Sequence, residues 1–257
     1  MHELTRARIE AATPSPPPAV PGIEGLRFPD EARLRAEMLV FLHGYPAGHG
    51  VWLFAHGVLM ASPGLASPDI VAAARVRGHV RASSLYDVTD RGTAAAPGLT
   101  FGLEPGPEGV VSGCAGLLLH LPGPDPRGAL WPAWRREMGP GFQEPSWVDT
   151  VMLPSEAPVR AMAFLPKPGH PLHAGRLPVA TVAERVARAR GPGGTAADAL
   201  LDVIAALRER QLRDPGLEML AGEVARRLAG RDAGIRPDGR PEREAVSRPT
   251  VRVGPTT

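Results

Sequence analysis

The chain has 257 residues, 43% of them hydrophobic and 22% charged, which suits one sizeable buried core with flexible ends. Lysine and arginine total 29 against 27 aspartates and glutamates, and a net charge of +2 argues against a dedicated nucleic-acid surface. The single cysteine, Cys114, excludes an internal disulfide framework and a cysteine-based metal cluster, and it favours a reducing, cytoplasmic location.

Residues 1–48 are expected to form an N-terminal extension. Residues 4–12 predict a short helix, and residues 13–22 predict an extended tether because five prolines lie there among small residues. Residues 30–41 begin with the good helix cap Asp30 and place their apolar side chains on one stripe. This pattern predicts a second helix that packs against the main domain. The charged start of the chain lacks the apolar core of an export signal.

A globular domain is expected over residues 49–229, starting with a buried strand at 51–55 that ends in a turn at His56 and Gly57. Five further strands are predicted from apolar runs separated by glycine and proline turns. Their ranges are 75–83, 99–103, 110–121, 147–153 and 159–165. A short helix is predicted at 126–138, between the strands at 110–121 and 147–153.

After Pro178 the apolar period changes from two to about 3.6, which predicts helices. Two of them carry the apolar stripes of residues 179–186 and 200–207, and Asp214-Pro215 is typical of the start of a third. Strands first and helices last indicate an α+β (mixed) fold, an open mixed β-barrel flanked by helices. Residues 230–257 have few apolar side chains and are expected to form a disordered tail.

Two kinds of enzyme are excluded by missing motifs. His43-Gly44-Tyr45-Pro46 is similar to an oxyanion loop of serine esterases, but the Gly-x-Ser-x-Gly elbow that such enzymes need does not occur. The eight histidines lack the spacing of metal ligands, so no metal is expected.

The sequence also argues against contacts with nucleic acid or a membrane. In the C-terminal tail, arginines alternate with acidic residues, which favours a solvated segment over a nucleic-acid arm. No apolar run of about 18 residues occurs, so no membrane contact is expected.

Six segments of the chain carry a family resemblance. In chain order they are VWLFAHGVLM, ARVRGHVRASS, DRGTAAAPGLTFGLEPG, WRREM, HPLHAGRL and GPGGTAADALLDVIAALRE. Each is weak alone, but together and in this order they resemble the ChaC-like γ-glutamylcyclotransferases over about residues 51–228. The resemblance implies the γ-glutamylcyclotransferase fold named above.

The resemblance also implies an activity. Members of this family cleave glutathione or related γ-glutamyl compounds without water, forming 5-oxoproline and releasing the amine portion, and they need no cofactor. The substrate's own α-amine attacks its γ-carbonyl, so the enzyme gains mainly by holding the two groups in a near-attack geometry. One further group must take the proton of the ammonium and return it to the leaving nitrogen. The match assigns that role to Glu137.

The residues around Glu137 permit two interpretations. Trp131, Trp134, Phe142 and Trp147 lie nearby in sequence, and if they enclose the carboxyl group they raise its pKa toward neutrality. Alternatively, Glu137 is an exposed carboxylate at a helix end, beside Arg135 and Arg136.

Substrate binding is assigned through the resemblance to His56, Gly57, Val58 and Leu59. Backbone N–H groups after a strand can bind an anion such as the substrate's α-carboxylate, although a strand followed by a tight turn is also common without function. Arg91 is expected to supply a cation to a carboxylate, the alternative being a surface turn held by one salt bridge.

Several positions depart from the family pattern. His56 replaces a loop tyrosine, Val58 replaces a loop serine, and Phe142, His173 and Ala199 stand where tyrosines are common. Two functions therefore stay open. The first, favoured because Glu137 is retained, is a cyclotransferase with a small-molecule γ-glutamyl substrate. The second is a catalytically impaired protein that acts as a γ-glutamyl-ligand binding or interaction module.

Overall fold

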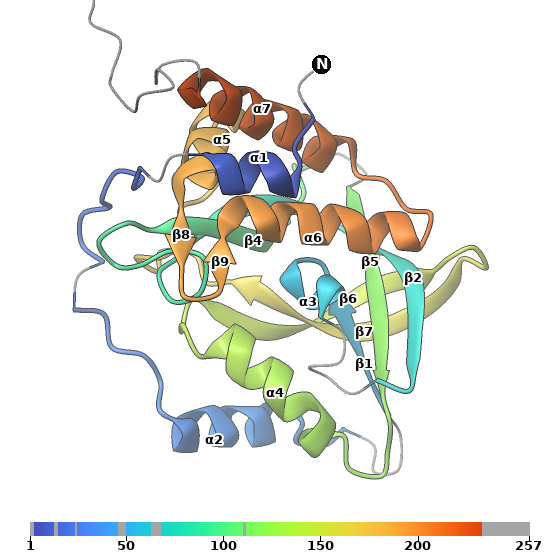
Figure 1. The fold of residues 1–257 in the computed structure, drawn as a ribbon. Helices are drawn as coiled ribbons and strands as arrows, with labels where there is room; N and C mark the ends of the chain where they lie inside the picture. The colour runs from blue at the N-terminus through green and yellow to red at the C-terminus, as the bar shows by residue number, and fades with distance from the viewer. Residues whose placement is uncertain are drawn as a thin grey trace, which may run out of the picture.

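The computed structural model describes residues 3–12, 15–23, 25–45, 50–62, 68–109 and 112–232, with only the backbone for 230–232. Five strands form a closed barrel in the order β1-β5-β2-β6-β7, with helices packed around it (Figure 1). Their bounds are β1 (Val51–Ala55), β5 (Gly113–Leu121), β2 (Ile70–Arg77), β6 (Gln143–Met152) and β7 (Ala157–Pro166). A parallel contact of β1 with β7 at Leu53 and Met162 completes the ring of antiparallel pairs. The predicted mixed barrel flanked by helices is therefore confirmed, but the barrel is closed and not open as expected, because this contact joins its two edge strands.

One strand prediction is wrong. Residues 75–83 do not form a single strand but belong to β2 and to β3 (His79–Asp87), which are separated by Gly78. Gly78 has a φ of +72°, a conformation that glycine adopts without the steric cost of a Cβ, and the chain turns there. Strand β3 then pairs with β4 (Gly98–Pro105) in a separate two-stranded sheet.

The predicted helices of the domain are confirmed. They are α4 (Arg127–Met138), α5 (Val179–Arg188), α6 (Ala196–Glu209) and α7 (Pro215–Asp232). Thr195 caps α6 by accepting a hydrogen bond from the Asp198 N–H at 2.9 Å, and Asp214 caps α7 in the same way for Leu217 at 3.1 Å. A small hairpin of β8 (Arg190–Gly191) and β9 (Gly194–Thr195) precedes α6. Helix α7 includes the first three residues of the predicted tail, and residues 233–257 lie outside the described residues.

The N-terminal extension packs on the domain. Helix α1 (Arg6–Ala11) contacts α6 and α7, and α2 (Glu31–Phe41) lies beside α4 (Figure 1). Asp30 caps α2 as predicted, accepting a hydrogen bond from the Arg33 N–H at 2.8 Å. Between these helices the extended segment is held by α5, where Arg185 donates to the Pro18 carbonyl at 2.9 Å.

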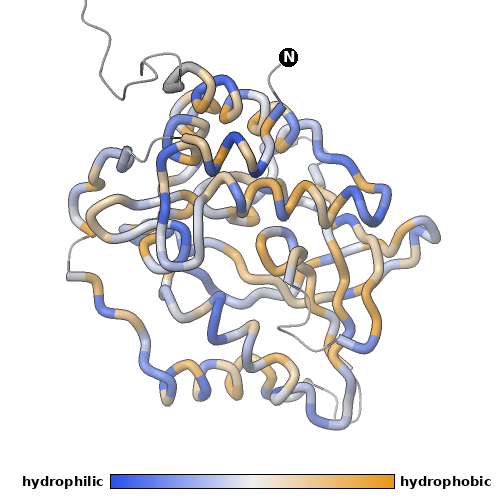
Figure 2. The backbone as a smooth tube through the Cα atoms, in the orientation of Figure 1, coloured by the Kyte–Doolittle hydropathy of each residue, from blue (hydrophilic) through white to orange (hydrophobic). Residues whose placement is uncertain are grey.

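The apolar residues form two main clusters on opposite faces of the barrel strands. Phe54 belongs to a cluster with members on all five barrel strands, so this cluster is the barrel interior. Its neighbours Leu53 and Ala55 point the other way, into the larger cluster under the helices, as the alternation of side chains along a strand requires. Figure 2 shows hydrophobic colour along the barrel strands and on α6, which lies over them. No helix in the described part of the chain is long and apolar enough to cross a membrane.

Candidate active site

Glu137 lies in the last turn of α4, at a cavity of about 410 Å³. The cavity is formed where α4, the start of β6, the β3–β4 turn and the segment after β1 meet. The Glu137 side chain is 22% exposed, so it is largely buried but reachable from the cavity. Other lining residues include Phe28, Val58, Asp87, Asp90, Phe101, Arg136, Phe142 and Gln143.

The surroundings of Glu137 change its acidity. Burial raises the pKa of the Glu137 carboxyl to about 7, and the negative charges of Asp87 and Asp90 raise it further, while Arg136 lowers it. The Arg136 Nε lies 3.8 Å from the carboxylate. At neutral pH the group is therefore present both as acid and as base, which is the state that a proton shuttle requires. Of the two interpretations that the sequence left open, the structure favours the enclosed carboxyl group with a raised pKa over the exposed carboxylate.

Gln143 orients the Glu137 carboxyl group. It is the first residue of β6 and only 1% exposed. In the amide orientation that pairs both groups, the Gln143 side-chain nitrogen donates to the Glu137 backbone carbonyl at 2.8 Å and to Glu137 Oε2 at 3.1 Å. Sequence reasoning missed Gln143, because nothing in its neighbourhood marks a glutamine at a strand start as functional.

The turn between β3 and β4 is held by one carboxylate. Asp87 accepts hydrogen bonds from the N–H groups of Thr89, Asp90 and Arg91 at 3.0, 2.9 and 3.0 Å. Asp90 in turn accepts a hydrogen bond from Arg136 Nη2 at 3.2 Å, which connects the turn to α4. The next residue must be Gly92, because a Cβ there would lie 2.1 Å from the Gly98 nitrogen. The turn thus holds Asp90 at the Glu137 cavity and fixes the position of Arg91 next to it.

The predicted binding loop is divided by the fold. Gly57 ends the strand segment and begins a one-turn helix, α3 (Val58–Ala61), and Val58 lines the Glu137 cavity. Leu59 is 4% exposed and packs into the core. Gly57 lies against Phe101, where an added Cβ would be 3.4 Å from the phenylalanine Cβ.

The His56 side chain points away from Glu137. Its Nε2 lies 3.3 Å from the Phe164 carbonyl oxygen on β7, and it lines none of the cavities found among the described residues. Burial and the nearby positive charge of Arg81 lower the pKa of His56 to about 3, so the imidazole is neutral at physiological pH. The structure therefore brings Val58 together with Glu137, but not the His56 side chain.

Arg91 lies at a second cavity, of about 440 Å³, which shares Val58 and Arg136 with the Glu137 cavity. The two cavities are thus neighbours across these two side chains. Among the positions where the family has tyrosines, Phe142 lines the Glu137 cavity, whereas His173 pairs with Glu104 at 3.0 Å and Ala199 is buried in α6. Within the described residues, no three His, Cys, Asp or Glu side chains are grouped so that they could hold a metal ion.

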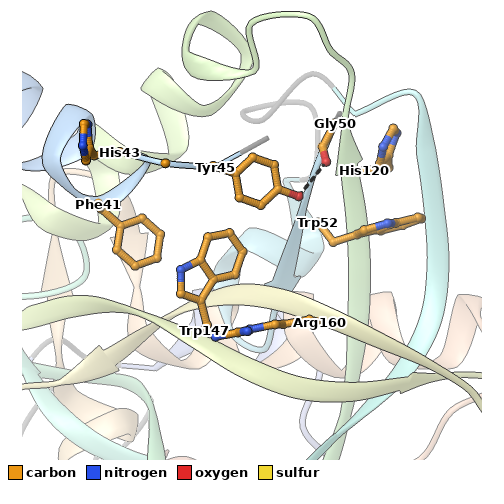
Figure 3. Close-up of a pocket in the computed structure, with 9 residues that line it drawn as sticks. Phe41, His43, Tyr45, Gly50, Trp52, His120, Trp147 and Arg160 are labelled. Carbon is orange, nitrogen blue, oxygen red and sulfur yellow. Dashed lines mark hydrogen bonds between the residues drawn. The ribbon is translucent and has the colours of Figure 1, made fainter. Parts of the chain in front are cut away.

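Trp147 does not enclose Glu137. It lies in a different cavity, of about 610 Å³, between the end of the N-terminal extension and the barrel (Figure 3). Its ring stacks with those of Phe41 and Tyr45, each at a centroid distance of 5.2 Å. Trp134 is fully buried in the main core, so of the aromatic residues near Glu137 in sequence it is Phe142 that lines its cavity.

Comparisons with known proteins identify the family. A family model described as ChaC-like protein matches residues 51–227. A curated relative from Escherichia coli (strain K12), named glutathione-specific gamma-glutamylcyclotransferase, is 32% identical over 179 residues, which are 70% of this chain and 74% of the relative.

Two crystal structures of a yeast gamma-glutamyl cyclotransferase specific to glutathione share the fold. Their TM-scores are 0.62 and 0.60, at sequence identities of 15% and 17%; they cover 69% and 70% of this chain, and 96% and 99% of their own. The family model spans well over half of the 257 residues, and the chain belongs to the ChaC-like protein family.

Proposed function

We propose that this protein is a γ-glutamylcyclotransferase that converts glutathione into 5-oxoproline and the dipeptide Cys-Gly, with Glu137 as its general base and acid. The observation that carries the proposal is the Glu137 carboxyl group, oriented by Gln143 at a cavity, with a pKa of about 7. The choice of glutathione is supported by the name of the Escherichia coli relative.

The reaction moves two protons and exchanges one C–N bond. Ionised Glu137 takes a proton from the substrate's α-ammonium group, and the free amine attacks the γ-carbonyl carbon to close a five-membered ring. Protonated Glu137 then gives the proton to the amide nitrogen, and the bond between that nitrogen and the γ-carbon breaks. Glu137 takes the second proton from the ring nitrogen, which becomes the lactam N–H, and passes it to the released amine, which leaves as an ammonium group. Neither water nor a redox partner is consumed, and Glu137 ends in its starting state. The enzyme's main contribution is to hold the amine and the carbonyl in a reactive geometry.

The charges around the cavity suit the two ends of the glutamyl group. Asp87 and Asp90 line it together with Glu137 and favour a bound ammonium group. The first N–H groups of a helix have no partner within the helix, and Val58 and Leu59 supply these groups in α3 for the α-carboxylate. Because these donors are backbone groups, the replacement of the family's serine by Val58 leaves them in place.

The proposed location is the cytoplasm, where thiols stay reduced. The support is the lack of an internal disulfide, because Cys114 is the single cysteine of the sequence. Its thiol is free and buried in the barrel interior, and burial raises its pKa.

The test is to incubate the purified protein with glutathione and quantify 5-oxoproline and Cys-Gly by mass spectrometry. We expect equal amounts of the two products, and a rate that falls by about 100-fold or more in Glu137→Gln, as is usual when a general acid-base group is removed. Glu144→Gln, an exposed carboxylate on β6, is the matched control and should keep full activity. If the folded protein forms no 5-oxoproline from glutathione or other γ-glutamyl compounds, the non-catalytic binding module is favoured instead.

A further inference from the structure

The second cavity, on the far side of Val58 and Arg136 from Glu137, has no assigned role. Its volume of about 440 Å³ is close to the 410 Å³ of the Glu137 cavity, and both are of the size that small-molecule sites have. It is lined by α3, α6, the β3–β4 turn and the N-terminal extension. Its charged lining residues are Arg6, Arg91, Arg136, Arg210, Asp202 and Glu209.

Arg91 is a partly buried cation whose Nε has no hydrogen-bond partner within the described residues. Its side chain is 16% exposed, its Nε lies 3.5 Å from the Asp90 carboxylate, and this Nε makes no hydrogen bond within the described residues. Asp90 already accepts a hydrogen bond from Arg136. The structure makes space for the guanidinium at Gly194, where a Cβ would lie 2.8 Å from Arg91 Nη1. A partly buried guanidinium with an unpaired Nε is stabilised by a ligand carboxylate, which it can bind with two parallel hydrogen bonds.

Arg6 offsets the negative charge of Asp202 on the wall of this cavity that α6 forms. It belongs to α1 of the extension, outside the residues matched by the family model, and its Nη1 and Nη2 donate to Asp198 and Asp202 at 2.9 and 2.5 Å. Asp202 lines the cavity, and without Arg6 its carboxylate would repel an anionic ligand. Arg210 on the same wall donates to the Val71 carbonyl at 3.2 Å, which leaves its positive charge in place.

We propose that this cavity is a carboxylate-binding subsite for the amine portion of the substrate, in which Arg91 binds the carboxylate and Arg6 neutralises Asp202. The inference rests on the proposed function: the γ-glutamyl group occupies the Glu137 cavity, and the amide bond to be broken lies at the boundary formed by Val58 and Arg136. The substrate class is then γ-glutamyl peptides with a free terminal carboxylate. In glutathione that carboxylate belongs to the glycine.

The first experiment compares glutathione with glutathione glycine-ethyl ester, which has the same skeleton without the terminal charge. We expect the native protein to use the free acid with a kcat/KM at least tenfold higher, mainly through a lower KM. Arg91→Met should remove this preference by raising the KM for glutathione and leaving the ester nearly unchanged. Arg91→Lys should keep part of the preference. Arg75→Met, an exposed arginine on β2, should change neither substrate, and thermal unfolding of each variant checks the fold.

The second experiment tests the role of Arg6 as a positioning residue. Arg6→Met should raise the KM for glutathione without lowering kcat, because the uncovered Asp202 repels the substrate carboxylate. The double variant Arg6→Met with Asp202→Asn should restore the KM, a result that a merely structural role of Arg6 does not explain.

Three outcomes separate the two proposals. Equal kcat/KM for both substrates in the native protein, or equal losses for both in Arg91→Met, would overturn the subsite and leave the proposed function intact. Absence of 5-oxoproline from both substrates would contradict the proposed function and this subsite with it.

A third experiment measures binding without chemistry, by calorimetry of Cys-Gly and of its C-terminal amide. Tighter binding of the free acid that is lost in Arg91→Met supports the subsite. Equal binding of the acid and the amide counts against it.

Discussion

At the scale of single residues, the proposed role of Glu137 predicts how activity depends on pH. Its pKa of about 7 results mainly from burial, which disfavours the charged carboxylate more than Arg136 favours it. The group must be ionised to accept the ammonium proton. We expect kcat/KM to rise about tenfold per pH unit below pH 7 and to level off above it, because this parameter reports ionisations of the free enzyme and free substrate. A profile between pH 5 and 9 measures this, and a midpoint near pH 4.5 would contradict the assignment.

The same pKa shift also affects folding stability. The folded state binds the Glu137 proton more tightly than the unfolded state, whose pKa is close to 4.5. Its contribution is therefore most favourable below pH 4.5 and is lost as the pH rises through 7. Glutamine does not ionise, so Glu137→Gln avoids the loss of stability that ionisation of the buried carboxyl group causes. The variant should therefore be at least as stable as the native protein at pH 8. The inactivation expected of this variant is then not a result of unfolding.

At the scale of an element, the β3–β4 turn shows how one side chain organises a site. The three N–H groups that donate to Asp87 are those of Thr89, Asp90 and Arg91, so the Asp87 carboxylate holds the two charged residues that face the cavities. Hydrogen bonds to a charged acceptor stabilise a protein by about 1.5–3 kcal/mol each and are not additive. Asp87→Ala should therefore lower the free energy of unfolding by about 3 kcal/mol, measured by urea denaturation.

The charge of Asp87 should also affect the pH dependence of activity, which a second substitution tests. Asp87→Asn keeps one oxygen acceptor and should lose less stability than the alanine variant. Its loss of charge should also move the midpoint of the pH profile downward, because the negative charge of Asp87 raises the pKa of Glu137. An unchanged midpoint would show that Asp87 acts on the turn alone.

At the scale of the whole molecule, the N-terminal extension is part of the folded unit. Leu34 and Met38 of α2 are each 3% exposed and belong to the main core cluster, and Phe28 and Arg6 line the two cavities. Leu34→Ala should lower stability by about 3 kcal/mol, the usual cost of removing a buried leucine, and Tm by roughly 6–12 °C. Leu39→Ala is the control on the same helix, because Leu39 is 49% exposed and its loss should change Tm little. Equal, small effects of both changes would show that α2 does not contribute to the core.

Local features of the sequence were sufficient to predict most elements, and the family resemblance supplied Glu137 as the candidate acid. Apolar periodicity and caps such as Asp30 depend on residues a few positions apart, and they predict α2, α4 to α7 and most strands correctly. Glu137 was assigned through motif order, and the sequence around it left open whether its carboxyl group is enclosed or exposed. The exception is Gly78, because an alternating pattern can continue across a glycine that ends one strand and begins another.

The tertiary structure decided how side chains distant in sequence meet. Arg6 reaches Asp198, 192 positions along the chain, and Gln143 reaches back across the turn between α4 and β6 to the Glu137 carboxyl. It also directs His56 to the Phe164 carbonyl, and Arg91 to a second cavity beside that of Glu137. No local pattern encodes these contacts, because they result from the closing of the barrel and the packing of helices on it. The sequence alone determined most elements and, through motif order, the candidate acid Glu137, whereas the packing of distant segments decided what surrounds that group and which charged side chains line the cavity beside it.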